Sequence, residues 1–196
     1  YIRTPENIGT AATLNRAISQ AAGQYITYLS ADDMMETTRL EKLYAVCIAN
    51  RHSLSYDDMC AFDSAGRGRL LPMLEYDFDR CLYKNLLHCG IMYPRAAWAE
   101  CGGYHEIFRD GREDWAMAIA LGVQGWCGVH VKEPLYLYRR EGQNRSLNNA
   151  GSVWRQTFLE RMQKTFPNLY RGERPEMCCG NSKRAAAISK SSSRTL

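Results

Sequence analysis

The sequence predicts an α/β fold with a mixed, mostly parallel sheet flanked by helices. Segments in which apolar residues recur at helical spacing alternate with short apolar runs typical of strands. The run "YITYL" at 25–29 lacks the polar alternation of a half-exposed strand and is typical of a strand covered on both faces, as parallel strands are. The chain has 196 residues, 45% hydrophobic and 23% charged, which suffices for one globular domain with a sizeable core.

The N-terminal quarter of the chain predicts a helix, a strand and a second helix. Apolar residues at helical spacing follow a turn at 7–9, and Gly23 stands where that first helix would end. The strand 25–29 comes next. Segment 37–50 is then helical by the spacing of Leu40, Leu43, Tyr44 and Cys47.

The remaining elements follow from the same patterns. Two strand-like runs, "SLSYDDMCAF" and "GRLLPMLEY", flank a turn-rich loop and predict a hairpin or two neighbouring strands. We then expect, in order, a short helix in "YDFDRCLYKNLL", a strand in "HCGIMYP", helical turns in "RAAWAEC", a glycine loop in "GGYHE", a helix in "REDWAMAIALGV", two strands broken at Pro134, and a helix in "SVWRQTFLERMQKTF". Residues 1–170 should form this domain, and 171–196 a flexible tail.

Composition argues against several classes of protein. The net charge of +4 comes from scattered Lys and Arg residues and from the tail, so a nucleic-acid groove is not expected. No run reaches the roughly 18 to 20 apolar residues of a membrane span. The eight cysteines form no C-x-x-C pair, which favours free thiols and a cytoplasmic location. The adjacent Cys178 and Cys179 lack a nearby Cys or His cluster, so they define no site.

Two adjacent carboxylates, Asp32 and Asp33, directly follow the predicted strand at 25–29. Ligands of open α/β sheets bind at the carboxyl ends of strands, so this pair is placed to hold Mg²⁺ or Mn²⁺ with a diphosphate. Asp residues after a strand also cap the next helix. On this pattern alone, the two interpretations are about equally supported.

A second acidic pair, Glu113 and Asp114, begins the helix predicted in "REDWAMAIALGV". One of these carboxylates could act as a general base if it lies in a dry pocket that admits a hydroxyl. The adjacent Trp115 would suit a sugar acceptor by stacking on its apolar face. Taken alone, this pair is more typical of acidic residues that stabilise a helix N-terminus than of a catalytic base.

Four segments in order resemble a family 2 glycosyltransferase of the GT-A fold: "ENIGTAATLNRAISQAAGQYITYLSADD", "GIMYPRAAWAECGGYHE", "GREDWAMAIAL" and "EPLYLYRREGQNRS". In that family an N-x-G … N-x-(G/A) helix leads into a buried strand that ends in a D-x-D type metal motif. A later E-D pair begins the helix that carries the base. The resemblance covers residues 7–146, and it is the ordered combination of motifs that is specific.

The resemblance implies inverting transfer of a sugar from a nucleotide-diphosphate sugar to a hydroxyl of a glycan, lipid-linked or protein acceptor. Asp32, with or without Asp33, would bind Mn²⁺ or Mg²⁺, and Asp114 would deprotonate the acceptor while Glu113 supports the pocket. The implied donor-side residues are Asn7, Gly9, Asn15 and Asp32. The implied acceptor-side residues are Gly102, Gly103, Tyr104 and Trp115.

The sequence also departs from the family pattern. Leu14, Ser30 and Glu141 stand where many members have Arg, Asp and His. The first strands, which hold the nucleotide base in that family, would precede Tyr1, so we expect a fragment of a longer protein. The main alternative is a non-catalytic, glycosyltransferase-like domain that binds carbohydrate or protein. A phosphoryl- or nucleotidyl-transferring enzyme is disfavoured because no glycine-rich or basic phosphate loop is present.

Overall fold

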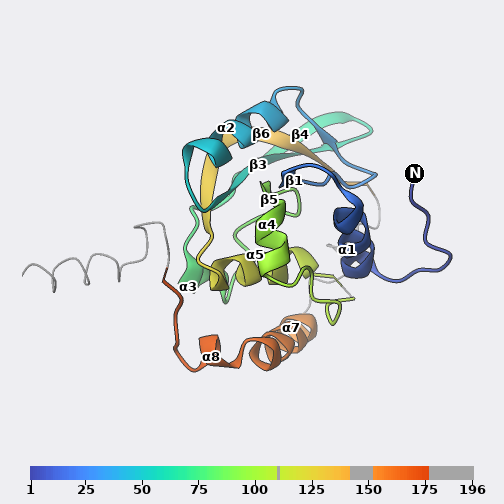
Figure 1. The fold of residues 1–196 in the computed structure, drawn as a ribbon. Coiled ribbons are helices and arrows are strands. Elements are labelled where there is room, and N and C mark those ends of the chain that lie inside the picture. The colour runs from blue at the N-terminus through green and yellow to red at the C-terminus, as the bar shows by residue number, and fades with distance from the viewer. Residues whose placement is uncertain (110, 142–151, 177–196) are drawn as a thin grey trace, which may run out of the picture.

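The computed structural model describes residues 1–109, 111–141 and 152–176. A four-stranded sheet lies between helix α2 on one face and a layer of helices on the other (Figure 1). In chain order the elements are α1 (Thr10–Gln20), β1 (Tyr25–Ile26), β2 (Met34–Met35), α2 (Arg39–Ala49), β3 (Ser53–Asp63), β4 (Gly66–Leu71), α3 (Phe78–Cys81), β5 (Tyr93–Pro94), α4 (Arg95–Glu100), α5 (Glu113–Val123), β6 (Cys127–Arg139), α7 (Ser152–Thr165) and α8 (Pro167–Tyr170).

The main sheet has the strand order β2-β6-β3-β4. Strands β3 and β6 run parallel and are paired from Ser53 opposite Cys127 to Phe62 opposite Arg139. The ladders β2–β6 and β3–β4 are antiparallel. The mixed α/β class is therefore confirmed, but the expectation of a mostly parallel sheet is wrong for the described residues, where β3–β6 is the parallel ladder.

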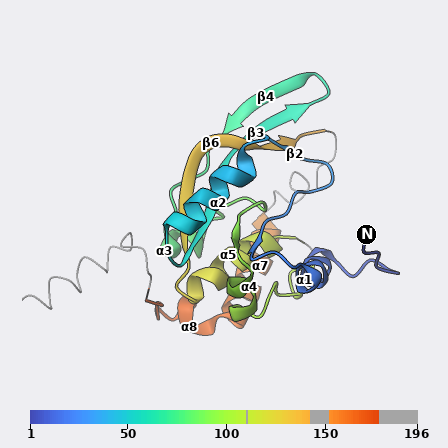
Figure 2. The ribbon, with the colours of Figure 1, turned by 45° about the horizontal axis from the view of Figure 1, so that its top comes forward.

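The predicted hairpin is confirmed as β3 and β4, which extend beyond the helices in Figure 2. The prediction of two separate strands on either side of Pro134 is wrong, because β6 continues through this residue. Its effect is local: the β3–β6 register shifts around Asp58, which pairs with Pro134. A proline lacks the N–H that a regular ladder requires, so an irregularity rather than a new strand forms there.

The strand predicted at 25–29 is only partly present. β1 has two residues and pairs antiparallel with β5, outside the main sheet. Its partner strand ends at Pro94, which has no N–H to donate, and α4 begins at the next residue. Ile26 is buried but Leu29 is 40% exposed, so the prediction of a strand covered on both faces is wrong.

Strand β3 is nevertheless covered on both faces. Leu54 and Tyr56 belong to the large core cluster that includes the apolar residues of α5. Ser55, between them, points the other way, and its hydroxyl donates to the carbonyl of Leu43 in α2 at 2.9 Å. The predicted sheet between helices is thus found at β3, where side chains alternate between the two helical layers.

The predicted helices are confirmed as α1, α2, α3, α4, α5 and α7, whereas the short α8 was not predicted. Within α2 the buried face differs from the prediction. Leu40 and Tyr44 are 43% and 45% exposed, and Arg39, Leu43 and Cys47 are buried. Among the described residues, no helix combines the length and apolar character needed to cross a bilayer.

The cysteines are mostly free thiols, as predicted. Five of the described ones carry free thiols: Cys47, Cys60 and Cys81, which are buried, and Cys89 and Cys101, which are half-buried. Cys127 is the exception, because it is disulfide-bonded. Cys178 and Cys179 lie outside the described residues, as does most of the predicted tail. Arg174, near its start, contacts Asp79 and donates to the carbonyl of Leu169 at 2.6 Å.

Candidate active site

The acidic pair lies in the turn between β1 and β2, against the carboxyl end of β6. The Asp33 carboxylate accepts hydrogen bonds from the hydroxyl of Tyr136 at 2.7 Å and from the backbone N–H of Arg139 at 2.9 Å. Because β3 and β6 run parallel, this position is the carboxyl end of the parallel pair. The pair was predicted at the carboxyl end of the strand 25–29, but that strand lies outside the main sheet and it is β6 whose carboxyl end the pair contacts.

The two carboxylates have different surroundings. Asp33 is 8% exposed, and burial raises the pKa of its carboxyl above the ordinary 3.8, although the bonds from Arg139 and Tyr136 oppose the shift. Asp32 is exposed, and among the described residues none donates to its carboxylate; only its backbone carbonyl is used, accepting from Arg139 Nε at 2.6 Å. Asp33 therefore fastens the turn, while Asp32 presents a carboxylate to solvent.

This geometry fits a divalent cation that takes one carboxylate ligand from the protein. Within the described ranges no group of three or more His, Cys, Asp and Glu side chains is arranged to hold a metal ion. Mg²⁺ sites that serve phosphate chemistry commonly use one or two carboxylates, with substrate phosphates and water as the other ligands. The single solvent-facing carboxylate of Asp32 fits that kind of site, and Asp33 is already engaged by protein donors.

A buried ion pair lies beneath the acidic turn. Arg39 is 0% exposed, and its guanidinium bonds to both carboxylate oxygens of Asp57. His88 Nε2 lies 3.2 Å from the same carboxylate. Burial alone would raise the pKa of Asp57, but the hydrogen bonds from His88 and Arg39 hold it below its usual value. The N–H of Gly90 donates to His88 Nδ1 at 3.1 Å, so Nδ1 is the acceptor of the ring. Nε2 therefore carries the hydrogen and donates a hydrogen bond to Asp57.

The candidate base Asp114 lies in the first turn of α5, which Arg112 precedes in the left-handed conformation at φ 68°. Burial raises the pKa of Asp114, although the backbone N–H of Trp115 and the charge of Arg112 oppose the shift. Asn85 Nδ2 lies 3.4 Å from the carboxylate. A half-buried carboxylate with raised proton affinity has one property that a general base requires.

Cys89 lies beside the Asp33 site. Its thiol lies 3.4 Å from the hydroxyl of Tyr136, which holds Asp33. Burial raises the pKa of Cys89 to about 11, and the charges of Asp114 and Asp33 both act on it in the same direction. Asp114 also acts on Tyr28, whose pKa burial raises strongly. Both acidic residues, 81 positions apart in sequence, therefore contribute to the electrostatic environment of Cys89.

The predicted acceptor residues of the glycine loop differ in accessibility. Gly102 and Gly103 have φ of 73° and 81°, as a tight turn requires. Gly102 is exposed, but Gly103 and Tyr104 are buried, and the hydroxyl of Tyr104 pairs with that of Tyr93 at 3.2 Å. A Cβ at position 103 would lie 2.7 Å from Asn15 Oδ1. Of these three residues, Gly102 is the one open to a ligand.

The predicted donor residue Asn15 connects α1 to this loop. Its Oδ1 accepts from the N–H of Tyr104 at 2.7 Å and from Trp98 Nε1 at 3.2 Å, and its Nδ2 donates to the carbonyl of Tyr104 at 2.9 Å. Nearer the N-terminus, Asn7 Oδ1 accepts from the N–H of Gly9 at 3.0 Å and so forms the turn before α1. Both asparagine side chains serve local structure.

Two further predicted residues, Trp115 and Glu113, are buried. Trp115 is 3% exposed, stacks on Phe158 with ring centroids 4.2 Å apart, and donates from Nε1 to the carbonyl of Cys81 at 2.6 Å. It offers no face to a sugar, so the predicted stacking role is wrong for this structure. Glu113 is 9% exposed, beside Asp114 in the same helical turn.

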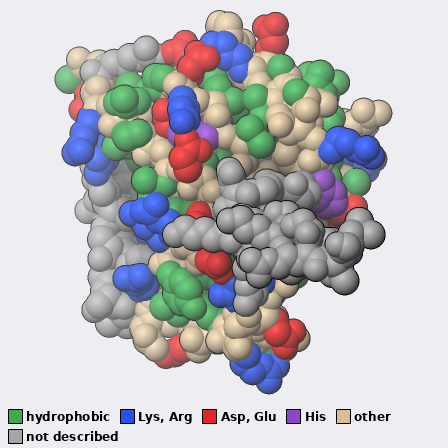
Figure 3. All heavy atoms as spheres, turned by 90° about the vertical axis from the view of Figure 1, so that its left-hand side faces the viewer, with side chains coloured by type: hydrophobic (Ala, Val, Ile, Leu, Met, Phe, Trp, Pro, Cys, Tyr) green, Lys and Arg blue, Asp and Glu red, His purple; other side chains and the backbone are tan. Residues whose placement is uncertain are grey.

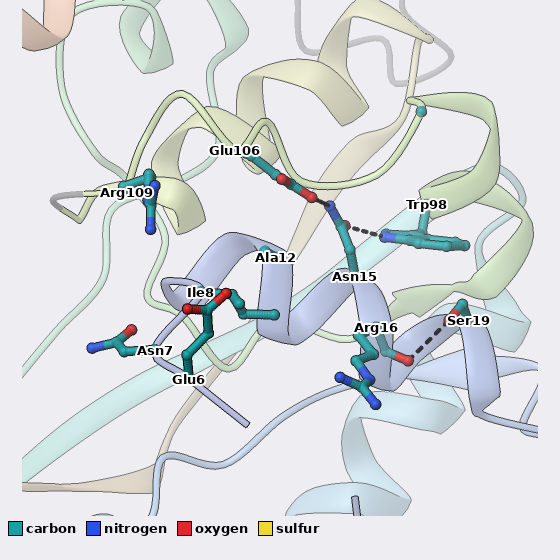
Figure 4. A pocket seen from close by; sticks show the side chains of 11 residues that line it. Glu6, Asn7, Ile8, Ala12, Asn15, Arg16, Ser19, Trp98, Glu106 and Arg109 are labelled. Atoms are coloured by element: carbon teal, nitrogen blue, oxygen red, sulfur yellow. Dashed lines mark hydrogen bonds between the residues drawn. The ribbon is translucent and has the colours of Figure 1, made fainter. Parts of the chain in front are cut away.

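An open pocket of about 920 Å³ lies between the N-terminal stretch, α1, α4 and the glycine loop (Figure 4). Arg16 and Arg109 face it together with Glu6 and Glu106, so its charge is balanced. It includes Asn7, Asn15 and Gly102 but none of the acidic residues discussed above. The left-hand face in Figure 1, seen directly in Figure 3, likewise mixes acidic, basic and hydrophobic side chains among its described residues.

Several residues of this site were not predicted from the sequence. Tyr136, Arg39, Asp57, His88 and Cys89 all lie between the two acidic pairs. For Tyr136 a signal existed: in "LYLYRR" it alternates with Leu135 and Leu137 near the predicted strand end. The pairing of Arg39 with Asp57 had no such signal, because the charged residues of α2 and β3 follow no pattern that would indicate which of them pair.

Comparisons with known proteins show similarity to glycosyltransferases. Residues 1–94 match the family described as Glycosyl transferase family 2. The chain is 31% identical over 144 residues to EpsE of Bacillus subtilis strain 168, provisionally named a glycosyltransferase, covering 71% of this chain and 52% of EpsE. It is 22% identical over 170 residues to an uncharacterized glycosyltransferase of Haemophilus influenzae, covering 79% and 60%. The chain thus spans between half and two thirds of these relatives.

Solved structures show the same fold. S. aureus TarS matches with a TM-score of 0.56 at 16% identity, covering 84% of this chain and 28% of TarS. The crystal structure of TarS 1–349 in complex with UDP-GlcNAc gives a TM-score of 0.52 at 19% identity, covering 81% of this chain and 53% of that one. At these identities the likeness concerns the fold.

Proposed function

We propose that the chain is part of a family 2 glycosyltransferase, whose family model residues 1–94 match, and that it transfers a sugar, with inversion, from a nucleotide-diphosphate sugar to an acceptor hydroxyl, assisted by Mn²⁺ or Mg²⁺. The observation that carries this proposal is the open carboxylate of Asp32 in the turn that Asp33 fastens to the carboxyl end of β6, together with a second carboxylate, Asp114, of different character. Asp32 is open to solvent, and Asp114 has a raised pKa. The bound UDP-GlcNAc of TarS supports a uridine diphosphate sugar as the first donor to test.

In this proposal Asp32 is the protein ligand of the cation. The cation would neutralise charge on the diphosphate as it leaves. Asp33 does not coordinate it but holds the turn, through its bonds with Tyr136 and Arg139. This assignment resolves the choice between Asp32 and Asp33 that the sequence left open.

Asp114 acts as the base. The acceptor oxygen attacks the anomeric carbon and the bond from that carbon to the diphosphate oxygen breaks, while the hydroxyl proton passes to the Asp114 carboxylate. One displacement of this kind inverts the configuration and requires no carboxylate nucleophile. Asn85, within 3.4 Å of the carboxylate, orients it, and Gly102 lies on the accessible part of the acceptor loop.

The test is release of UDP from UDP-GlcNAc by the chain with Mn²⁺ and a panel of glycan acceptors, comparing wild type with Asp114→Asn. Loss of a general base typically reduces the rate by about 10²- to 10⁴-fold. Binding of the donor should be unchanged, and Asp79→Asn, which alters a 66% exposed carboxylate, should keep full activity. Unaltered turnover in Asp114→Asn would show that another group is the base.

A further inference from the structure

The turn that carries Asp32 leads directly into the β2–β6 ladder and is held by further bonds from the end of β6. Asp33 accepts from Tyr136 Oη at 2.7 Å and from the N–H of Arg139 at 2.9 Å, and Arg139 Nε donates to the carbonyl of Asp32. The flanking strand β2 has two exposed residues. The hydroxyl of Tyr136 is the attachment that comes from the buried interior, because Tyr136 is 0% exposed whereas Arg139 is at the surface end of β6.

Tyr136 is itself held by packing. Its ring lies 5.0 Å from the guanidinium carbon of Arg39 and 4.7 Å from the ring of His88. Gly90 leaves room for it, because a Cβ there would come within 2.6 Å of the ring. The hydroxyl has a single proton, which goes to Asp33, so the contact at 3.4 Å with Cys89 is a bond donated by the thiol.

Arg39 is held in place by hydrogen bonds as well as by packing. It makes three hydrogen bonds to Asp57 at 2.9 to 3.2 Å, and Nη2 also donates to the carbonyl of Gly90. The Arg39 guanidinium, which lies below the Tyr136 ring, is thus hydrogen-bonded to the carbonyl of Gly90. Thr27, which follows β1 and precedes the acidic turn, donates from Oγ1 to the same carbonyl at 2.9 Å.

We propose that Tyr136 is a positioning residue for the metal-binding turn, and that the Arg39–Asp57–His88 cluster holds its ring in place. The hydroxyl fixes Asp33, and with it the direction in which the adjacent Asp32 carboxylate points. This inference rests on the proposed function for the metal that Asp32 binds. Groups that orient metal ligands from behind typically change metal affinity by about 10- to 100-fold when they are removed.

The test compares Tyr136→Phe with Tyr56→Phe by two measurements. Tyr56 is a matched control: it is also 0% exposed, and its hydroxyl donates one hydrogen bond, to the carbonyl of Leu74 at 2.8 Å, away from the acidic turn. The first measurement is hydrogen exchange of the Asp33 amide, which donates to the carbonyl of Ser30 at 3.1 Å. The second is calorimetric binding of UDP at increasing Mn²⁺ concentration.

In Tyr136→Phe we expect the Asp33 amide to exchange about 10-fold faster, as loss of a hydrogen bond to a charged group implies. The Mn²⁺ concentration needed for UDP binding should rise at least about 10-fold. Tyr56→Phe should change neither. Equal effects in both variants, or no change in Tyr136→Phe, would overturn the proposal. Faster exchange in Tyr136→Phe without Mn²⁺-dependent binding in wild type would instead refute the proposed function and the metal role, while leaving the structural contact established.

Discussion

Arg39 and Asp57 form an ion pair at 2.9 Å in which both side chains are 0% exposed. Such a pair is costly to break, because removing one charge leaves the other buried without a partner. Here the pair also lies under the ring of Tyr136, between α2 and β3. Its integrity therefore affects both the stability of the sheet and the position of the acidic turn.

The first prediction concerns the pH dependence of this pair. Because the pKa of Asp57 is lowered in the fold, its contribution to stability is present above the ordinary value of 3.8 and is lost as the pH falls through the lower folded value. Asp57→Asn should reduce the free energy of unfolding by about 3–5 kcal/mol at pH 7. As the pH falls below 3.8 and through the lower folded pKa of Asp57, the difference from wild type should shrink. Urea denaturation at several pH values measures this difference in the free energy of unfolding, with the exposed Asp79→Asn as control.

A second prediction concerns Gly90. A Cβ at this position would lie 2.6 Å from the Tyr136 ring and 3.0 Å from Arg39 Nη2. Gly90→Ala should therefore lower stability by about 1–3 kcal/mol, the usual cost of overpacking. Gly68→Ala, whose Cβ meets one backbone oxygen at 3.2 Å, should cost less. Thermal unfolding of the two variants compares them, and equal losses would contradict the packing described around Tyr136.

The third prediction separates structure from binding at Asn15. Its carboxamide accepts from the N–H of Tyr104 and from Trp98 Nε1, so Asn15→Ala leaves both donors without this partner. We expect a loss of about 1–3 kcal/mol in stability. Asn7→Ala, which removes one exposed local bond, should cost less. If Asn15→Ala weakens donor binding without destabilising the fold, Asn15 is a donor ligand rather than a connector of α1 and the glycine loop.

The fourth prediction is the pH profile of turnover. Because the pKa of Asp114 is raised by burial, the base becomes protonated at a pH above the ordinary 3.8, and kcat/KM should fall below that raised value. Besides burial, the groups that act on it, all opposing the shift, are the backbone N–H of Trp115, Arg112, Asn85 and His88. The rate of UDP release measured between pH 4 and pH 9 should show this acidic limb. In Asp114→Asn the remaining activity should lack it.

Much of the fold follows from apolar periodicity, and α1, α5 and the β3–β4 hairpin were predicted on that basis. The buried face of α2 was predicted only in part. Leu43 and Cys47 are buried as predicted, but Leu40 and Tyr44, chosen because they are apolar, are exposed, and the buried Arg39 was not predicted. A buried arginine is stable only with its partner Asp57, and the pairing of distant charges is invisible to a periodicity argument.

The same limit applies to the candidate site. Asp32, Asp33 and Asp114 were predicted because short polar groups follow strands or begin helices in a recognisable way. Their different roles depend on contacts across 103 residues of chain, between Asp33 and Tyr136, and on which carboxylate remains open. Trp115 was assigned to the acceptor because a tryptophan beside a carboxylate suits a sugar, but its partner Phe158 comes from a distant helix.

The central claim is that Asp32 holds a divalent cation against a nucleotide diphosphate. Calorimetric titration of UDP and GDP into the chain, with and without Mn²⁺, tests it most directly, using wild type, Asp32→Asn and the exposed control Glu41→Gln. We expect Mn²⁺-dependent binding of a nucleotide by wild type and Glu41→Gln, and its loss in Asp32→Asn. Mn²⁺-dependent binding that persists unchanged in Asp32→Asn, or no Mn²⁺-dependent binding in wild type, would contradict the claim.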